Sequence, residues 1–203
     1  MVKVGLLGGS FDPIHLGHLV LAEEARERLG LARVLFVPNR LPPHKTGREM
    51  APPADRLEMV RLAIAGNPAF EASEIELWRD GPSYSIDTVT RFRADHEDWD
   101  IHFLIGADTL PELPTWYRAE DLAARCKFVV ASRPGQSLRN LDPLRGTFTE
   151  DQIAAVAARC IEIPLIGVSS TEIRQRVREG CSIRYLVPEA VMDYIRGRGL
   201  YRP

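Results

Sequence analysis

Buried-strand patterns alternate with amphipathic-helix patterns through most of this 203-residue chain. Short apolar runs that end at glycine or proline predict strands, and apolar residues spaced three and four apart predict helices. Because such alternation builds βαβ units, we expect an α/β fold, a Rossmann-like, doubly wound, mostly parallel sheet with C-terminal helices. Strands are expected at 2–7, 32–38, 101–106, 127–132 and 161–166. Helices are expected at 17–29, 54–66, 85–96, 149–160, 169–180 and 188–199, with another that begins near Thr115.

Three segments follow neither pattern. Residues 39–53 are polar and rich in proline, and a loop of this length often carries function. Residues 71–85 mix strand signals with a Gly-Pro turn, and residues 137–148 are the one candidate for disorder. We therefore expect a single domain over 1–203, with a helical C-terminal part from about residue 165.

Composition and charge exclude several classes of protein. The net charge of -2 offers no basic field for nucleic acid or an anionic membrane. The three cysteines, Cys126, Cys160 and Cys181, are scattered, which favours reduced thiols over a disulfide framework or a zinc site. No apolar run approaches the ~20 residues of a membrane span, and no signal-peptide pattern opens the chain. We expect a cytoplasmic protein, and a homo-oligomer is left open.

Polar and glycine-containing motifs follow each expected strand. In open parallel sheets, ligands bind beyond the carboxyl ends of the strands. The motifs at these ends are GGSFDP, PNRLPPHK, GADT, SRPG and GVSST. Five such motifs at one rim of the sheet indicate a binding site there.

The first of these motifs is suited to binding phosphate. Gly8 and Gly9 allow a sharp turn and a close approach of the backbone to a ligand. The helix that follows directs free N–H groups and its positive end to the same place. His15 and His18 are three residues apart, so both face one side, where imidazoles donate hydrogen bonds to phosphate, more strongly if protonated. By themselves the two histidines could be incidental, and a zinc site would lack further ligands.

A second helix start, in GVSSTEIRQRVREG, has the same character. Ser169 is the expected N-cap, and Glu172 follows it with capping-box spacing. Arg174 lies one turn further, where its guanidinium could reach back over the helix start toward an anion. On residues alone, an ordinary capped surface helix with solvated arginines is the alternative.

The string Gly-Gly-Ser-Phe-Asp-Pro-Ile-His-Leu-Gly-His resembles the signature of the nucleotidyltransferase superfamily with HxGH motifs. That resemblance implies that His15, His18 and Arg174 are catalytic and contact the triphosphate of ATP. Asp12 and Pro13 are expected to shape the turn. The implied ATP-binding residues are Gly8, Gly9, Ser10, Phe11, Arg133, Ser169, Ser170 and Thr171.

Further segments, among them GPSYSIDT and GADTLPELPTWY, resemble the bacterial nicotinate mononucleotide adenylyltransferases from residue 4 to residue 202. Pantetheine-phosphate adenylyltransferases share the first motif but lack the PTWY segment. The resemblance implies that Trp116 stacks on the nicotinate ring and that the start of the helix at Ser85 holds its carboxylate. The implied residues that bind nicotinate mononucleotide are His44, Lys45, Ser83, Tyr84, Ser85, Asp108 and Trp116.

Three of these residues have ordinary alternatives. Trp116 could belong to the core, Asp108 could be an N-cap, and Lys45 could be a solvated loop charge.

The resemblance implies transfer of the adenylyl group of ATP to nicotinate mononucleotide, giving nicotinate adenine dinucleotide and pyrophosphate. The expected substrates are these two small molecules, with Mg²⁺ arriving on ATP and no protein ligand assigned to it. Two alternatives stay open. One is a related transferase that uses nicotinamide mononucleotide or phosphopantetheine, and the other is a non-catalytic nucleotide-binding module.

Overall fold

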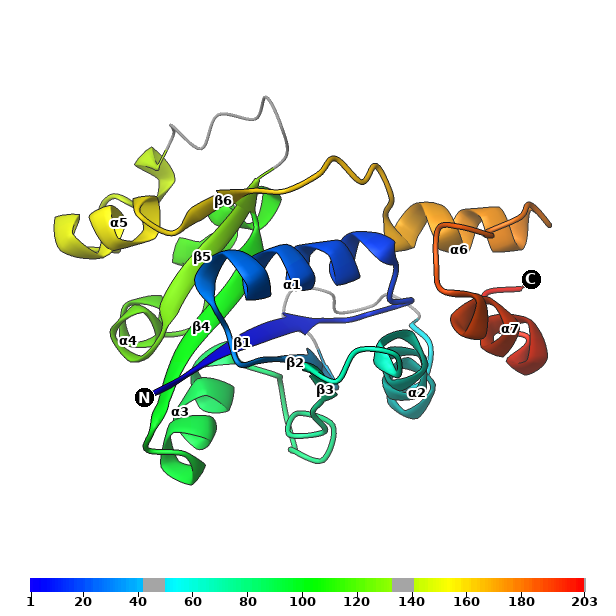
Figure 1. Cartoon of the computed structure of the whole chain (residues 1–203), viewed down its shortest axis with the longest axis horizontal. Helices are drawn as coiled ribbons and strands as arrows, with labels where there is room; N and C mark the ends of the chain where they lie inside the picture. The colour runs from blue at the N-terminus through cyan, green and yellow to red at the C-terminus, as the bar shows by residue number, and fades with distance from the viewer. Residues whose placement is uncertain (42–49, 133–140, 203) are drawn as a thin grey trace.

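A computed structural model describes residues 1–41, 50–132 and 141–202. Its six parallel strands form one sheet in the order β3-β2-β1-β4-β5-β6, with helices on both faces (Figure 1). This is the order of a doubly wound sheet that reverses direction beside β1, so the expected fold class is confirmed. The strands are β1 (Val2–Gly9), β2 (Arg33–Pro38), β3 (Phe70–Ala72), β4 (Trp99–Gly106), β5 (Lys127–Ser132) and β6 (Cys160–Glu162).

The helices connect these strands and extend the C-terminal end. The α-helices are α1 (Leu16–Leu29), α2 (Pro53–Ile64), α3 (Ser85–Asp95), α4 (Ala119–Arg125), α5 (Glu150–Ala157), α6 (Ser170–Arg178) and α7 (Glu189–Arg198). Two 3-10 helices are η1 (Ala107–Thr115) and η2 (Asp142–Leu144).

Both faces of the central strands are buried. Leu6 of β1 pairs with Phe103 of β4, and both side chains enter the hydrophobic cluster on the face covered by α3 and α4. Leu7 and Leu104, the next residues along, enter the cluster on the other face, beneath α1. Because successive side chains point to opposite faces, strands covered on both sides need nearly continuous apolar sequence. This is why the strand segments could be recognised from the sequence.

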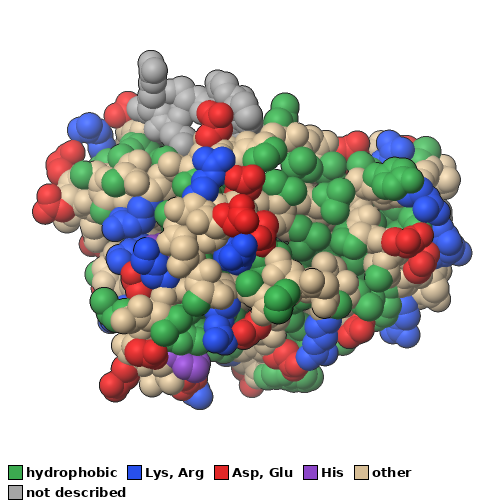
Figure 2. Space-filling model, in the orientation of Figure 1, with side chains coloured by type: hydrophobic (Ala, Val, Ile, Leu, Met, Phe, Trp, Pro, Cys, Tyr) green, Lys and Arg blue, Asp and Glu red, His purple; other side chains and the backbone are tan. Residues whose placement is uncertain are grey.

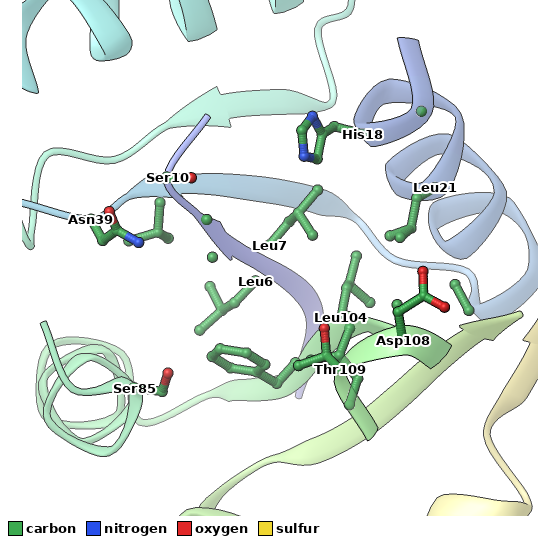
Figure 3. A pocket seen from close by; sticks show the side chains of 18 of the residues that line it. Leu6, Leu7, Ser10, His18, Leu21, Asn39, Ser85, Leu104, Asp108 and Thr109 are labelled. Carbon is green, nitrogen blue, oxygen red and sulfur yellow. The ribbon is translucent and has the colours of Figure 1, made fainter. Parts of the chain in front are cut away.

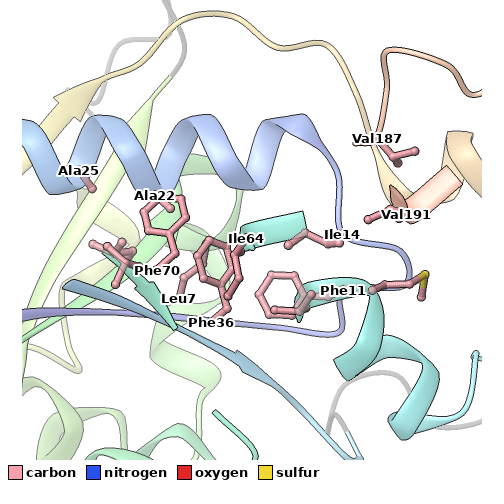
Figure 4. Packing of buried hydrophobic residues seen from close by; sticks show 14 of the residues in the cluster. Leu7, Phe11, Ile14, Ala22, Ala25, Phe36, Ile64, Phe70, Val187 and Val191 are labelled. Atoms are coloured by element: carbon pink, nitrogen blue, oxygen red, sulfur yellow. The ribbon is translucent and has the colours of Figure 1, made fainter. Parts of the chain in front are cut away.

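The C-terminal helices share a core with the turn between β1 and α1. Phe11 and Ile14 of that turn pack in one cluster with Phe36 of β2 and with Val187 and Val191 of the C-terminal part (Figure 4). In Figure 1, α6 and α7 lie beyond the carboxyl end of β1. The packing therefore brings the C-terminal end of the chain against the glycine-rich turn.

Two of the expected elements are wrong in extent. The strand expected at 161–166 is only β6, Cys160–Glu162, and the chain then runs without regular structure to α6. Pro164 has no N–H to donate to a sheet. The helix expected to begin near Thr115 is α4, which begins four residues later, at Ala119. The 3-10 helix η1, which contains Pro111 and Pro114, ends at Thr115. Arg118 has a left-handed backbone, with φ of 54°, which separates the two helices.

The structure describes part of the three segments that had no clear sequence pattern. Within 71–85, the strand signal corresponds to the end of β3, and turns follow it up to α3. In the segment 137–148, residues 141–148 are ordered rather than disordered, because Leu144 and Phe148 are buried in the core. Of the loop expected at 39–53, residues 42–49 lie outside the described part of the chain.

Acidic and basic side chains are interspersed over the face shown in Figure 2, with no large patch of one sign. This agrees with the small net charge of the sequence. Within the described residues, no helix combines the length and apolar character needed to cross a membrane.

Helix α7 is attached to α2 through a buried carboxylate. Asp55 of α2 is 5% exposed, and its Oδ1 accepts hydrogen bonds from the Tyr194 hydroxyl at 2.8 Å and from Arg198 Nε at 3.1 Å. Two donors from α7 thus hold this C-terminal helix against α2, which packs on the sheet.

We predict that Tyr194→Phe lowers the free energy of unfolding by about 1 kcal/mol, the usual net value of one hydrogen bond. Urea denaturation of the purified protein measures this. Tyr185→Phe is the control, since Tyr185 is 81% exposed and should leave the midpoint unchanged. Equal midpoints for the two variants would show that the Tyr194 bond does not stabilise the fold.

Candidate active site

A cavity of about 490 Å³ opens at the carboxyl ends of the central strands. Its walls come from the end of β1, the first turns of α1 and α3, η1, and the segment that leads into α6. Figure 3 shows His18 and Leu21 facing the cavity from α1 and Ser85 facing it from the opposite side. Its size is within the range of a small-molecule site. The expectation that the motifs meet at one rim is confirmed in part, since GGSFDP, PNRLPPHK, GADT and GVSST each contribute residues to the cavity wall. Of SRPG the structure describes only Ser132, which does not line the cavity.

The glycine-rich turn forms the phosphate-binding candidate. Gly8, Gly9 and Ser10 line the cavity. A Cβ on Gly9 would lie 3.3 Å from the ring of Phe11, so a side chain there would press on this ring. Phe11 has a positive φ of 46° and is 1% exposed. The ring is packed in the core (Figure 4), so the side chain of Phe11 supports the turn, and contact with ATP through its backbone stays a prediction.

The two histidines are stacked at the start of α1. Their ring centroids are 3.7 Å apart, and both rings line the cavity. The backbone N–H of His15 donates to Nδ1 of His18 at 3.2 Å. Because Nδ1 accepts this bond, a neutral His18 carries its proton on Nε2. This hydrogen bond therefore makes Nε2 the hydrogen-bond donor of a neutral His18 before any ligand binds.

His15 is buried and electrically neutral. It is 8% exposed, and its Nδ1 has no hydrogen-bond partner among the described residues. Burial lowers the pKa of His15 to about 4. The sequence analysis allowed for protonated histidines at phosphate, but in the free protein His15 is uncharged at neutral pH. A buried polar atom without a partner is costly, and it marks a position where a ligand could supply the missing bond.

Gly17 allows this arrangement. A Cβ at position 17 would lie 3.1 Å from both Cε1 and Nδ1 of His15. The glycine between the two histidines therefore leaves room for the His15 ring, a reason for that residue that the sequence alone did not provide.

The start of α6 is attached to the same turn. Ser169 is its N-cap as expected, and its Oγ accepts from the N–H of Glu172 at 3.1 Å. The hydroxyl of Ser170 donates to the carbonyl of Pro13 at 2.9 Å. Ser169 and Ser170 line the cavity, so the starts of α1 and α6 open into it together. Two helix N-termini that converge on one space favour a bound anion.

Arg174 occupies a different place from the one expected. It is 4% exposed and is not among the cavity-lining residues. Its Nη1 donates to the carbonyl of Asp12 at 2.5 Å, and its Nη2 donates to the Thr171 hydroxyl at 3.2 Å. The guanidinium does not reach over the helix start into the cavity, because the Asp12 backbone and Thr171 hold it. Thr171 likewise does not line the cavity.

Asp12 links four distant parts of the chain. It is 2% exposed, and its Oδ1 accepts from the N–H of Ala51 at 3.1 Å and from the Tyr201 hydroxyl at 2.8 Å. Its Oδ2 lies 3.5 Å from Nη1 of Arg174. Burial and the Asp12 charge raise the pKa of Tyr201 well above its usual value, so the hydroxyl keeps its proton. The expectation that Asp12 and Pro13 shape the turn is confirmed.

Arg56 is a supporting residue that the sequence analysis missed. It is fully buried in α2, and its guanidinium donates to backbone carbonyls of Ser10 at 2.7 Å, Ala51 at 3.0 Å and Arg40 at 3.4 Å. Burial lowers its pKa from the usual value. One cation thus connects the glycine-rich turn to both described ends of the loop. Nothing in the local sequence distinguishes Arg56 from a surface arginine of α2.

The residues expected to bind the acceptor line the same cavity, as far as the structure describes them. They are Ser83, Tyr84, Ser85, Asp108 and Trp116. Figure 3 shows Ser85 across the cavity from His18, and Asp108 on the side of Leu21. Tyr84 lies in the segment that leads into α3, and its ring is 4.5 Å from that of Tyr117.

Trp116 follows η1, is partly buried, and contacts the edge of Phe103 at 5.9 Å between centroids. It therefore belongs both to the cavity and to the rim of the core. The alternative that Asp108 is an N-cap is not supported, since η1 begins at Ala107 after Gly106.

Ser83 differs in part from the expectation. It is 8% exposed, and its hydroxyl oxygen accepts from the N–H groups of Arg40 at 3.1 Å and Leu41 at 3.4 Å. Its side chain therefore fastens the start of the loop to the start of α3. His44, Lys45 and Arg133 lie outside the described residues.

The described residues contain no group of three or more His, Cys, Asp or Glu side chains that could hold a metal ion.

We predict that protonation of His15 opposes folding. The unfolded chain takes up this proton near pH 6.5 and the folded chain only near pH 4, so stability falls as the pH drops between these values. Between pH 7 and pH 5, the native protein should lose about 2 kcal/mol relative to His15→Gln, which has no imidazole. Urea denaturation at both pH values measures the difference. Parallel losses in the two proteins would contradict the burial of a neutral His15.

Comparisons with known proteins agree with the fold. The family model described as cytidylyltransferase-like matches residues 6–176. A protein of Geobacillus thermodenitrificans is 43% identical over 201 residues, covering 99% of this chain and 87% of its own length. One of Moorella thermoacetica is 44% identical over 202 residues, covering 99% of this chain and 92% of its own length. Both bear the name probable nicotinate-nucleotide adenylyltransferase.

Among solved structures, nicotinic acid mononucleotide adenylyltransferase of Plasmodium falciparum, complexed with NaAD, superposes with a TM-score of 0.77. The sequences are 18% identical, and the match covers 99% of this chain and 98% of the other. At this identity the similarity concerns the fold.

Proposed function

The chain belongs to the cytidylyltransferase-like family, and from this membership we propose that it transfers the adenylyl group of ATP to nicotinate mononucleotide, releasing pyrophosphate. The full-length relatives at 43% and 44% identity support the choice of reaction and acceptor.

The observation that carries the proposal is the paired histidines at the start of α1, which face the cavity together with the start of α6. His18 has its donor on Nε2, since its Nδ1 accepts from the backbone of His15. Ser169 and Ser170 bring a second helix N-terminus to the same space. Fixed donors and helix ends aimed at one point stabilise charge that develops on a transferring phosphoryl group. A purely structural turn would not need this set of donors.

The reaction requires positioning more than proton transfer. The acceptor phosphate has a second pKa of about 6, by analogy with phosphoserine, so it is largely ionised at pH 7 and needs no general base. One of its oxygens forms a bond to the α-phosphorus of ATP, in line with the bond to the β-bridging oxygen, which breaks. The electron pair leaves with pyrophosphate, and the histidine donors and Mg²⁺ carried by ATP offset the charge. No covalent enzyme intermediate forms.

Arg174 has a supporting role in this scheme. Its hydrogen bonds to Asp12 and Thr171 favour a role in holding the starts of α1 and α6 together over direct contact with the triphosphate. Phe11 supports the turn in the same indirect way, from the core.

The acceptor would lie at the other end of the cavity. Trp116 offers an aromatic face for a pyridine ring, and the start of α3 at Ser85 offers backbone N–H groups for a carboxylate. An amide acceptor has no anion to place at this helix end. We therefore propose a preference for nicotinate over nicotinamide mononucleotide.

We predict strong pyrophosphate release with ATP, Mg²⁺ and nicotinate mononucleotide, and much weaker release with nicotinamide mononucleotide or phosphopantetheine. A coupled pyrophosphate assay on the purified protein, with identification of the dinucleotide product, measures all three acceptors. Preference for another acceptor would retain the phosphate site and reject the proposed acceptor pocket. ATP binding without release from any acceptor would favour a non-catalytic nucleotide-binding module.

We predict that His18→Ala lowers kcat by about 10²-fold or more, as expected for loss of one preorganised donor. His96→Ala is the matched control, because His96 is also stacked on an aromatic ring, that of Trp99, at 3.8 Å between centroids but outside the cavity. Circular dichroism should show both variants folded. Near-native turnover in a folded His18→Ala protein would remove His18 from the mechanism.

A further inference from the structure

A buried carboxylate on the cavity wall has no part in the chemistry described above. Glu76 lies in the turns between β3 and α3 and is 7% exposed. It lines the cavity together with Ser83, Tyr84 and Ser85, at the end assigned to the acceptor. The histidines and the start of α6 need no carboxylate there, so its presence calls for another explanation.

Glu76 is bound to the first turn of α3. The Thr88 hydroxyl, one turn into this helix, donates to Oε1 of Glu76 at 2.6 Å. Ser83, which precedes the helix, favours the charged form of Glu76 and so lowers the pKa of this carboxyl. The carboxylate is therefore attached to the first turns of α3 through Thr88.

Arg79 also contacts the start of α3. Its Nη1 lies 3.3 Å from Oγ1 of Thr88, and its Nη2 donates to the carbonyl of Tyr84 at 3.3 Å. The carbonyl of Tyr84 is the last one before α3 begins. The carboxylate of Glu76 and the guanidinium of Arg79 thus contact the same short segment through side chain and backbone.

The electrostatics show what this arrangement costs. Burial raises the pKa of Glu76, and the repulsion of Asp87 acts in the same direction. The hydrogen bond from Thr88, the interaction with Ser83 and the charge of Arg79 oppose the shift. Burial of a carboxyl group costs free energy unless hydrogen bonds compensate it. An apolar side chain at position 76 would avoid this cost but could not accept the hydrogen bond from Thr88.

We propose that Glu76 is a positioning residue that fixes the start of α3, and through it the discrimination between an acidic and an amide acceptor. The inference rests on the proposed function. A carboxylate is recognised by N–H groups in a fixed direction, and a displacement of about 1 Å in a positioning element can cost 10²-fold. Glu76 acts by accepting the hydrogen bond from Thr88, so its effect falls on the acceptor and not on ATP.

The test compares four variants with the native protein in the same pyrophosphate assay. Glu76→Ala removes the acceptor oxygens, and Thr88→Val breaks the same bond from the helix side with almost no change in shape. Glu76→Gln keeps an oxygen that accepts from Thr88. Glu74→Gln is the control, since Glu74 lies two residues away and bonds Trp78 Nε1 at 2.8 Å on the surface. The Michaelis constants of ATP and of both pyridine mononucleotides are measured for each.

We predict that Glu76→Ala and Thr88→Val raise the KM of nicotinate mononucleotide about tenfold, the size of one lost hydrogen bond. The KM of ATP should stay within about twofold, and the preference for the acid over the amide should fall about tenfold. Glu76→Gln should stay within about threefold of the native protein, and Glu74→Gln should match it. If Glu76→Ala does not fold, Thr88→Val decides the question.

Several results would overturn the inference. One is an unchanged acceptor KM in Thr88→Val, and another is an equal rise of both Michaelis constants, which indicates general loosening of the fold. Glu76→Gln as defective as Glu76→Ala would show that the charge, and not the hydrogen bonding, is what matters. If the native protein itself releases no pyrophosphate with nicotinate mononucleotide, the proposed function fails and takes the inference with it. A normal native protein with unaffected variants rejects the inference alone.

Discussion

The carboxylate of Asp12 joins the glycine-rich turn to the loop at Ala51, to Arg174 of α6 and to Tyr201 near the end of the chain. These groups are far apart in sequence, and each of them satisfies a buried charge that would otherwise be costly. Removal of one partner leaves the buried Asp12 carboxylate less well compensated. The geometry of the cavity therefore depends on this carboxylate, although Asp12 itself does not line the cavity.

A second buried charge works in parallel with the first. Among the described residues, Arg56 donates to the backbone carbonyls of Ser10, Arg40 and Ala51. Because carbonyls carry no net charge, they do not neutralise the guanidinium, and the negative charge of Asp12 compensates it in part. Asp12 and Arg56 hold the turn from two sides. The His15 and His18 rings can then be stacked in one orientation before any substrate binds.

The site shows the usual conflict between stability and function. His15 is held neutral, with a buried Nδ1 that finds no partner among the described residues, at the point where an anion is expected. Glu76 is buried in the wall of the same cavity, where it accepts a hydrogen bond from Thr88 of α3. Residues that a sheet-and-helix scaffold would not need are thus concentrated around one cavity, as is common at functional sites. The core beneath them, with Phe11 and Ile14, provides the compensating burial.

The sequence by itself determined the parallel sheet and the N-cap at Ser169, and the resemblance of its first motif pointed to His15 and His18. The sheet and the cap follow from local rules, continuous apolar runs that alternate with helical periodicity and capping residues at helix starts. The turn expected at Gly8 and Gly9 comes later, because both glycines end β1 and the backbone turns after Ser10. The tertiary structure alone decided the roles of Arg174, Arg56 and Glu76, because their partners lie far along the chain or across a turn. Local sequence shows the position of a charged residue in the chain. Only tertiary packing decides whether its side chain contacts a ligand, a backbone carbonyl or another buried charged group.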